Sequence, residues 1–127
     1  MPITFTVNNA DKYFVSSFKG AVTDDELVNS FIEFYESEQW TPGMNELTDL
    51  SEGDASQITT KGLQKLAVVT EQIFLKHEVK YSKTAVYAPK DLAYGLSRMY
   101  EVMIDESPEH FCVFRDIDEA KKWLTDK

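Results

Sequence analysis

Residues 84–99 read TAVYAPKDLAYGLSRM, and this stretch decides the expected fold. An apolar run from Ala85 to Ala88 stops at Pro89, and a helical pattern of apolar residues begins directly after the proline. A strand that leads straight into a helix is the repeating unit of a parallel α/β sheet. Such a junction also gathers free backbone N–H groups at the start of the helix, where α/β domains commonly bind their ligands.

The rest of the chain can be divided into further strands. Alternating apolar and polar residues predict strands at 3–8 and 12–20, which we expect to pair as an antiparallel hairpin at one edge of the sheet. A third strand is predicted at 45–50, and the apolar run 111–114 predicts a central parallel strand. The polar, acidic and small residues of 51–59 predict the longest loop.

Four helices are predicted between and after these strands. The expected helix starts are a capping box formed by Thr23 and Glu26, a cap at Thr60, the residue after Pro89, and a cap at Asp116 or Asp118. In the third helix, Leu92, Leu96, Met99, Tyr100 and Met103 are expected to be buried, and the first three form an apolar stripe. The predicted fold class is therefore α/β, as one domain over residues 1–127 with the order ββαβαβαβα. We expect about five strands in a mostly parallel sheet, with an antiparallel N-terminal edge strand.

The charge balance limits the classes of partner. The chain has 127 residues, of which 13 are Lys or Arg and 22 are Asp or Glu, giving a formal net charge of −9. Such an acidic protein repels phosphate backbones, so nucleic acid is not an expected partner. No apolar run approaches the ~18 residues of a membrane span. The single Cys112 cannot form an internal disulfide, and the opening MPITFTVN lacks the pattern of a secretion signal, so we expect a cytoplasmic location.

A candidate ligand site lies at the start of the third predicted helix. Asp91, Tyr94, Arg98, Glu101 and Asp105 recur at helical spacing on the face opposite the apolar stripe. The Arg98 guanidinium can lie over the Tyr94 ring and can also pair with Glu101. Gly95 costs a helix about 1 kcal/mol relative to alanine, which indicates that a backbone or a ligand approaches closely there. We therefore predict a site for an anionic or amphipathic molecule at Lys90, Asp91, Tyr94, Gly95 and Arg98. The alternative is a solvated helix face with one ion pair.

Three other residues are candidates for regulation or assembly. Thr60 lies at a predicted helix N-terminus, where a phosphate group would be stabilised, although a plain N-cap explains the same residue. Trp40 in a Pro-Gly turn and Trp123 near the C-terminus are candidate anchors for a second subunit, as in a homodimer. They are equally suited to covering the ends of the core.

The sequence offers little for catalysis or metal binding. His77 and His110 have no Cys or His at ligand spacing, so no metal site is expected. The chain contains neither a Gly-rich phosphate loop nor a nucleophile elbow. We therefore expect that the protein is not an enzyme and uses no cofactor.

Three segments carry a resemblance to a known family. They are YAPKDLAYGLSRMYE at 87–101, WTPG at 40–43 and VFRDIDEAKKWL at 113–124. With them the chain resembles small bacterial proteins of the SpoIIAA-like fold, which are grouped with STAS and CRAL-TRIO lipid-transfer domains. The resemblance covers nearly the whole chain and implies a sheet of about five strands with helices packed against it.

The same resemblance implies two functional precedents. STAS anti-sigma-factor antagonists are switched by phosphorylation of a serine in an Asp-Ser-x-x-Gly-like motif at the start of the second helix. The corresponding segment here, ASQITTKGL at 55–63, places Thr60 two residues before Gly62 and lacks the Asp-Ser pair. The lipid-transfer relatives enclose an apolar ligand, which in so short a chain implies a small acyl or aromatic molecule.

The function expected from the sequence is a non-enzymatic cytoplasmic binding or regulatory domain for a partner protein or a small amphipathic, lipid-like ligand. One alternative is a phospho-regulated, STAS-like switch that acts through Thr60. Another is an enzyme whose site is assembled only in the fold. A strongly shifted pKa in a cleft would favour that last alternative.

Overall fold

A computed structural model describes residues 2–126 and contains five strands and four α-helices within that range. In chain order the elements are β1 (Ile3–Asn8), β2 (Tyr13–Ala21), α1 (Asp24–Glu36), β3 (Asn45–Asp54), the short 3-10 helix η1 (Ala55–Gln57), α2 (Thr60–Lys76), β4 (Ser82–Tyr87), α3 (Asp91–Met103), β5 (Glu109–Phe114) and α4 (Ile117–Thr125). The predicted order of strands and α-helices is confirmed.

The strands form one sheet in the order β1-β2-β3-β4-β5. β1 pairs with β2 in the antiparallel sense, and the other three pairings are parallel, as predicted. The prediction that 111–114 forms a central strand is wrong, because β5 is the last strand of a sheet that is wound in sequence order and therefore lies at its edge. Of these four residues, only Val113 is fully buried.

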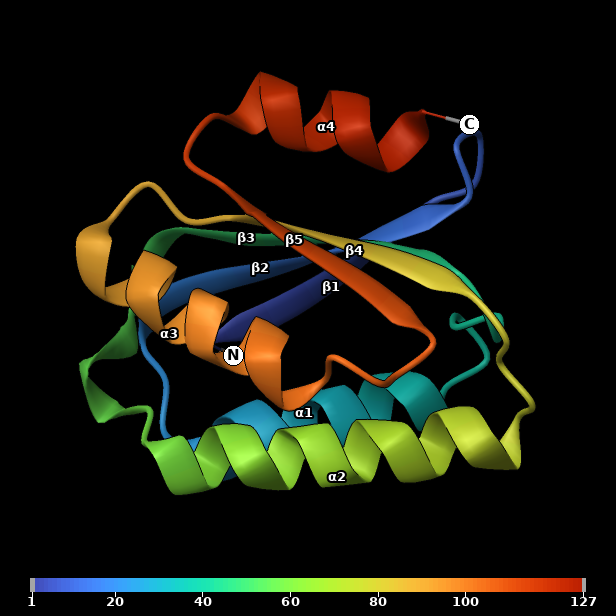
Figure 1. Cartoon of the computed structure of the whole chain (residues 1–127), viewed down its shortest axis with the longest axis horizontal. Helices are drawn as coiled ribbons and strands as arrows, with labels where there is room; N and C mark the ends of the chain where they lie inside the picture. The colour runs from blue at the N-terminus through green and yellow to red at the C-terminus, as the bar shows by residue number, and fades with distance from the viewer. Residues whose placement is uncertain (1, 127) are drawn as a thin grey trace.

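The helices cover the two faces of the sheet unequally (Figure 1). A right-handed connection between adjacent parallel strands places its helix on a fixed face, so α1, α2 and α3 lie together on one side. α4, which follows β5, covers the opposite face. The central strands are consequently covered on both faces.

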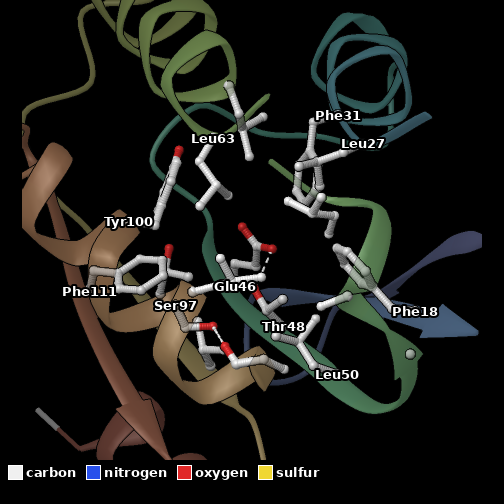
Figure 2. Close-up of a pocket in the computed structure, with 18 of the residues that line it drawn as sticks. Phe18, Leu27, Phe31, Glu46, Thr48, Leu50, Leu63, Ser97, Tyr100 and Phe111 are labelled. Carbon is white, nitrogen blue, oxygen red and sulfur yellow. Dashed lines mark hydrogen bonds between the residues drawn. The ribbon is translucent and has the colours of Figure 1, made fainter. Parts of the chain in front are cut away.

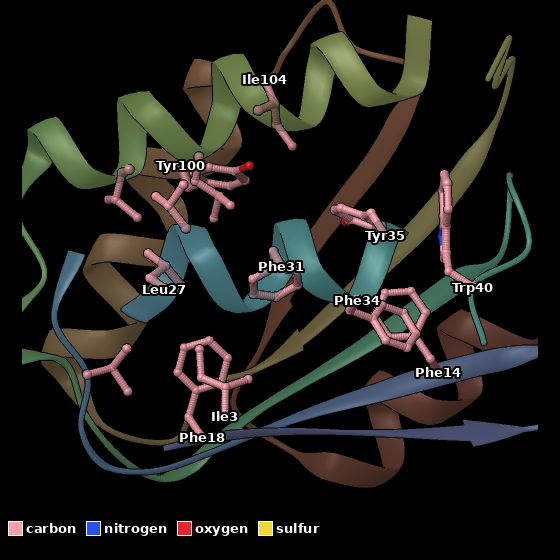
Figure 3. Packing of buried hydrophobic residues seen from close by; sticks show 14 of the residues in the cluster. Ile3, Phe14, Phe18, Leu27, Phe31, Phe34, Tyr35, Trp40, Tyr100 and Ile104 are labelled. Atoms are coloured by element: carbon pink, nitrogen blue, oxygen red, sulfur yellow. The ribbon is translucent and has the colours of Figure 1, made fainter. Parts of the chain in front are cut away.

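The main core lies between the sheet and the three crossover helices (Figure 3). It is rich in aromatic side chains: the Phe5 and Phe34 rings stack with centroids 4.5 Å apart, and Phe31 meets Phe5 edge-on at 5.2 Å. Trp40 is only 6% exposed and stacks on Phe74. Trp40 therefore covers one end of this core and is not available as an exposed anchor for a second subunit.

The helix starts follow the local sequence closely. Thr23 and Glu26 form the predicted capping box, and Asp116 caps α4 by accepting hydrogen bonds from two backbone N–H groups. α2 begins at Thr60 as predicted, but its cap is Thr59, whose hydroxyl accepts from the Gly62 N–H.

Two details of the core differ from prediction. Leu92 and Met99 are 54% and 41% exposed, whereas Tyr100 is buried as predicted. The other two buried residues of α3 are Ala93 and Ser97. The helix is thus rotated about its axis relative to the expected stripe. The loop predicted at 51–59 is also shorter, because β3 continues to Asp54 and pairs with the end of β2 beyond a bulge.

Candidate functional site

A cavity of about 100 Å³ lies inside the main core, between the sheet and helices α1, α2 and α3. Figure 2 shows apolar side chains from both layers around it. Its walls include Phe18, Leu27, Phe31, Leu63, Leu66 and Leu96. Ala93 and Ser97 line it where α3 comes closest to the sheet, so the space exists partly because these two side chains are small.

Polar residues form the sheet side of this cavity. Alternate residues of a strand point to the same face. Glu46 and Thr48 of β3, Thr84 of β4 and Glu109 of β5 all line the cavity and are buried. Glu46 is in register with Thr84, which in turn contacts Glu109. Side chains 63 positions apart in sequence therefore form one buried polar row.

Glu46 is the central group of that row. Its carboxyl group lies in the middle of the cavity (Figure 2), and the residue is 5% exposed. The hydroxyls of Ser16 and Thr48 donate to Oε2 at 2.6 Å and 2.7 Å. Burial raises the pKa of Glu46, and the two hydroxyl donors oppose that rise because they stabilise the anion.

Glu109 has fewer partners. It is 8% exposed, and the Thr84 hydroxyl donates to Oε2. Oε1 is buried and has no hydrogen-bond partner within residues 2–126. Burial, followed by the nearby Glu46 charge, raises the pKa of Glu109 from 4.5 to about 7, while the Thr84 hydrogen bond opposes the rise. Glu109 lines the cavity, and a buried acceptor without a partner is uncommon in folded proteins and calls for an explanation.

The phenols of Tyr35 and Tyr100 complete the polar surroundings. Burial, together with the charges of the two glutamates, raises the pKa of both phenols well above the usual value, so they stay neutral. Among the described residues that line the cavity there is no Lys, Arg or His. The acid pair consequently has no counter-ion in the cavity wall.

One side of the cavity is formed by the segment after β3. Asp54, Ala55 and Ile58 line it, and Asp54 is exposed. The Asp54 side chain caps η1 by accepting from the Ser56 N–H at 2.9 Å, which lowers its pKa. Lys90 donates from Nζ to the Gly53 carbonyl at 3.3 Å, so its ammonium lies beside this rim without lining the cavity.

No protein-family model and no curated protein matches the chain. The chain is similar in structure to an uncharacterised protein of the DUF3478 family, with a SpoIIAA-like fold, from Shewanella loihica PV-4. The TM-score is 0.56, the sequence identity is 23%, and the match covers 96% of this chain and 91% of the other. The chain has a SpoIIAA-like fold. At this level of identity the likeness concerns the fold alone, and the site must be judged on its own geometry.

The ligand site predicted for this SpoIIAA-like domain lies on the outer face of α3. Asp91 pairs with Arg115 at 2.8 Å, and the Arg115 guanidinium lies 4.2 Å from the centre of the Tyr94 ring. The predicted stacking of Arg98 on that ring is wrong, because Arg115 occupies the ring face, and the predicted pair of Arg98 with Glu101 is confirmed at 3.5 Å.

None of the five predicted residues lines the cavity. At Gly95, an added Cβ would meet no atom of the described chain within 4 Å. The close approach expected from that glycine is thus not made by the chain itself. The structure brings Asp91 and Tyr94 together through Arg115, and it leaves Arg98 apart.

Thr60, the candidate phosphoacceptor, is exposed on the first turn of α2. The position that an anion would take at this helix start is held by Asp24, which accepts from the Thr59 N–H at 2.8 Å and the Thr59 hydroxyl at 2.5 Å. A phosphate on Thr60 would add negative charge beside that carboxylate. The phosphorylation switch expected from the sequence at Thr60 therefore has little electrostatic support here.

The remaining candidate side chains, Trp123 and Cys112, are packed against neighbouring residues. Trp123 is half-buried against Phe114, and the Lys83 ammonium lies 5.0 Å from the centre of the Trp123 ring. Burial raises the pKa of the Cys112 thiol, which disfavours a reactive thiolate. Over residues 2–126, no group of His, Cys, Asp or Glu is arranged to hold a metal ion, and no helix is long and apolar enough to cross a membrane.

Glu46 and Glu109 are the functional candidates that the sequence analysis missed. A signal for Glu46 was present: in the segment NELTDL, Glu46 and Thr48 alternate with Leu47 in a strand expected between two others. In a sheet covered on both faces, the polar side of such a strand also points into the protein.

Proposed function

We propose that this protein is a cytoplasmic, non-enzymatic binding domain whose interior cavity takes up a small amphipathic molecule. The observation that supports this most directly is Glu109, which lines the cavity and whose buried Oε1 has no hydrogen-bond partner within residues 2–126. An unpartnered buried polar atom costs about 1–3 kcal/mol. A ligand with a hydrogen-bond donor at one end would remove that cost, and its apolar part would contact Phe18, Phe31 and Leu63.

The cavity volume limits the size of the ligand. Apolar cavities of about 150 Å³ take up benzene, and this one measures about 100 Å³. We infer a ligand with a short alkyl chain or a comparable apolar group. A whole phospholipid is far too large. Of the five residues predicted from the sequence to bind a ligand, Lys90 lies at the rim of the cavity, where it contacts the Gly53 carbonyl.

Filling the cavity tests the proposal. Ser97 lies on α3 at the cavity wall, so Ser97→Leu should occupy the space a ligand needs. Val102→Leu on the same helix is a matched control, because Val102 is 76% exposed. With 1-butanol as the probe, backbone amide NMR titrations should show shifts around Thr48 and Ser97 in the unmodified protein and in the control. The Ser97→Leu variant should lose them, and equal binding by all three proteins would refute the proposal.

A second candidate function is general acid–base catalysis at the same place. Two buried carboxyl groups with raised pKa values are the arrangement expected of a proton-transferring pair. The small volume restricts any substrate to a few heavy atoms, which disfavours hydrolases of sugars or peptides. The NMR titration separates the two functions, because a binding domain returns its ligand unchanged and an enzyme produces new resonances.

A further inference from the structure

The ionisable side chains that line the cavity are carboxylic acids and neutral phenols. If the cavity binds a ligand as proposed above, these side chains limit the charge that the ligand can carry. The ionisable groups on its walls are Glu46, Glu109, Asp54 and the neutral phenols of Tyr35 and Tyr100. Lys90 lies at the rim, where its ammonium group donates to the carbonyl of Gly53. An anionic ligand such as a carboxylate would therefore meet only like charge in the interior.

The hydrogen bonds that the acid pair accepts come from neutral donors. Ser16 and Thr48 donate to Glu46, and Thr84 donates to Glu109. Each is a hydroxyl, so neither carboxyl group is neutralised by a cation. A buried carboxylate is normally paired with a cation or a metal ion, because isolated charge is costly to bury. Here the cavity wall provides acceptors, and within residues 2–126 Oε1 of Glu109 accepts no hydrogen bond.

We infer that the cavity selects small alkylammonium cations over alcohols and carboxylates of the same length, with Glu109 and Glu46 receiving the ammonium group. A primary ammonium has three N–H donors and no acceptor, which complements a wall made of acceptors. Its short alkyl chain fits the apolar walls and the volume of about 100 Å³. The overall charge of −9 also favours the approach of a cation.

Ammonium binding would be coupled to the ionisation of Glu109. The groups that face it from the surrounding elements are Glu46 on β3, Thr84 on β4, Tyr35 on α1 and Tyr100 on α3, and none is basic. With a pKa of about 7, Glu109 is about one-tenth ionised at pH 6 and about nine-tenths ionised at pH 8. An alkylammonium stays charged across this range. Its affinity should therefore rise about tenfold from pH 6 to pH 8.

The test compares n-butylammonium, 1-butanol and butyrate on the full chain by amide NMR titration at both pH values. At pH 8 the amine should bind at least tenfold more tightly than the alcohol, and butyrate more weakly than either. Glu109→Gln should reduce amine affinity about tenfold and abolish its pH dependence, while changing 1-butanol affinity less than twofold. Glu33→Gln is the matched control, since Glu33 is exposed on α1.

The outcomes distinguish this inference from the proposed function. If 1-butanol or butyrate binds in the cavity as tightly as the amine, or if amine affinity is the same at both pH values, the ammonium inference is refuted and the binding function stands. If none of the three probes shifts the cavity amides, the proposed function itself fails. The pH comparison uses the unmodified protein, so it remains decisive even if the Glu109→Gln variant does not fold.

Discussion

Replacing Glu109 with Gln should stabilise the protein at about pH 8 and have little effect at pH 4.5. The pKa of Glu109 rises from 4.5 to about 7 on folding, so between these values the native state holds a proton that the unfolded chain has released. Because the native state binds more protons, the free energy of unfolding falls as the pH rises through this window. The contribution of the protonated acid is complete below 4.5 and is lost as the pH passes about 7.

The interval between the two pKa values sets the size of the effect. At about 1.4 kcal/mol per pH unit, it corresponds to about 3 kcal/mol. Glutamine has nearly the shape of the protonated acid and does not ionise, so the variant avoids this loss. Its amide oxygen can accept the Thr84 hydroxyl as Oε2 of Glu109 does.

Urea unfolding followed by circular dichroism at several pH values between 4.5 and 8 measures the effect. The quantity of interest is the free energy of unfolding of Glu109→Gln minus that of the unmodified protein, which should grow by about 3 kcal/mol across the range. Glu33→Gln removes an exposed carboxylate and should give a nearly constant difference. A constant difference for Glu109→Gln as well would refute the reasoning about burial.

Three further predictions concern the same pair and two helix glycines. Glu46→Gln should bring the pKa of Glu109 down toward 4.5, because the Glu46 charge is one cause of its rise; carbon-13 NMR titration of the carboxyl groups measures this, and an unchanged value would contradict it. Gly62→Ala should lower stability by about 1–3 kcal/mol, since its Cβ would lie 2.0 Å from an Asp24 carboxylate oxygen. Gly95→Ala, where an added Cβ meets open space, should instead raise stability by about 0.5–1 kcal/mol, and thermal unfolding in which Gly62→Ala is the more stable variant would overturn both expectations.

The sequence predicted the features of this fold that depend on local chemistry. The Thr23 capping box, the interruption at Pro89 and the strand alternation depend on neighbouring residues, and each has its expected counterpart in the structure. The position of β5 was not predictable in the same way. An apolar run fits both a central strand and an edge strand that a helix covers, and only the order of strands in space decides between them.

The candidate site was missed because the polar residues of the strand predicted at 45–50 were not considered as interior residues. In β3, Leu47 points toward α4, and its polar neighbours Glu46 and Thr48 are buried on the other face. The other face of β3 is covered as well, by the crossover helices, so those polar residues are also inside. Glu109 had a further obstacle: it is the first residue of β5, and its proximity to Glu46 depends on β4 lying between their strands.

The orientation of α3 determines which of its side chains are exposed and which face the sheet. Turning Leu92 and Met99 inward would bury more apolar area, and area alone would favour that arrangement. The helix instead presents Ala93 and Ser97 to the sheet, which leaves room for a cavity above two carboxyl groups that have no cation. Burying an unpaired acid is not a stabilising choice for a core. The cavity and the acid pair thus both lower the stability of the fold at the same place. Features that lower stability in this way are expected where a protein binds a ligand.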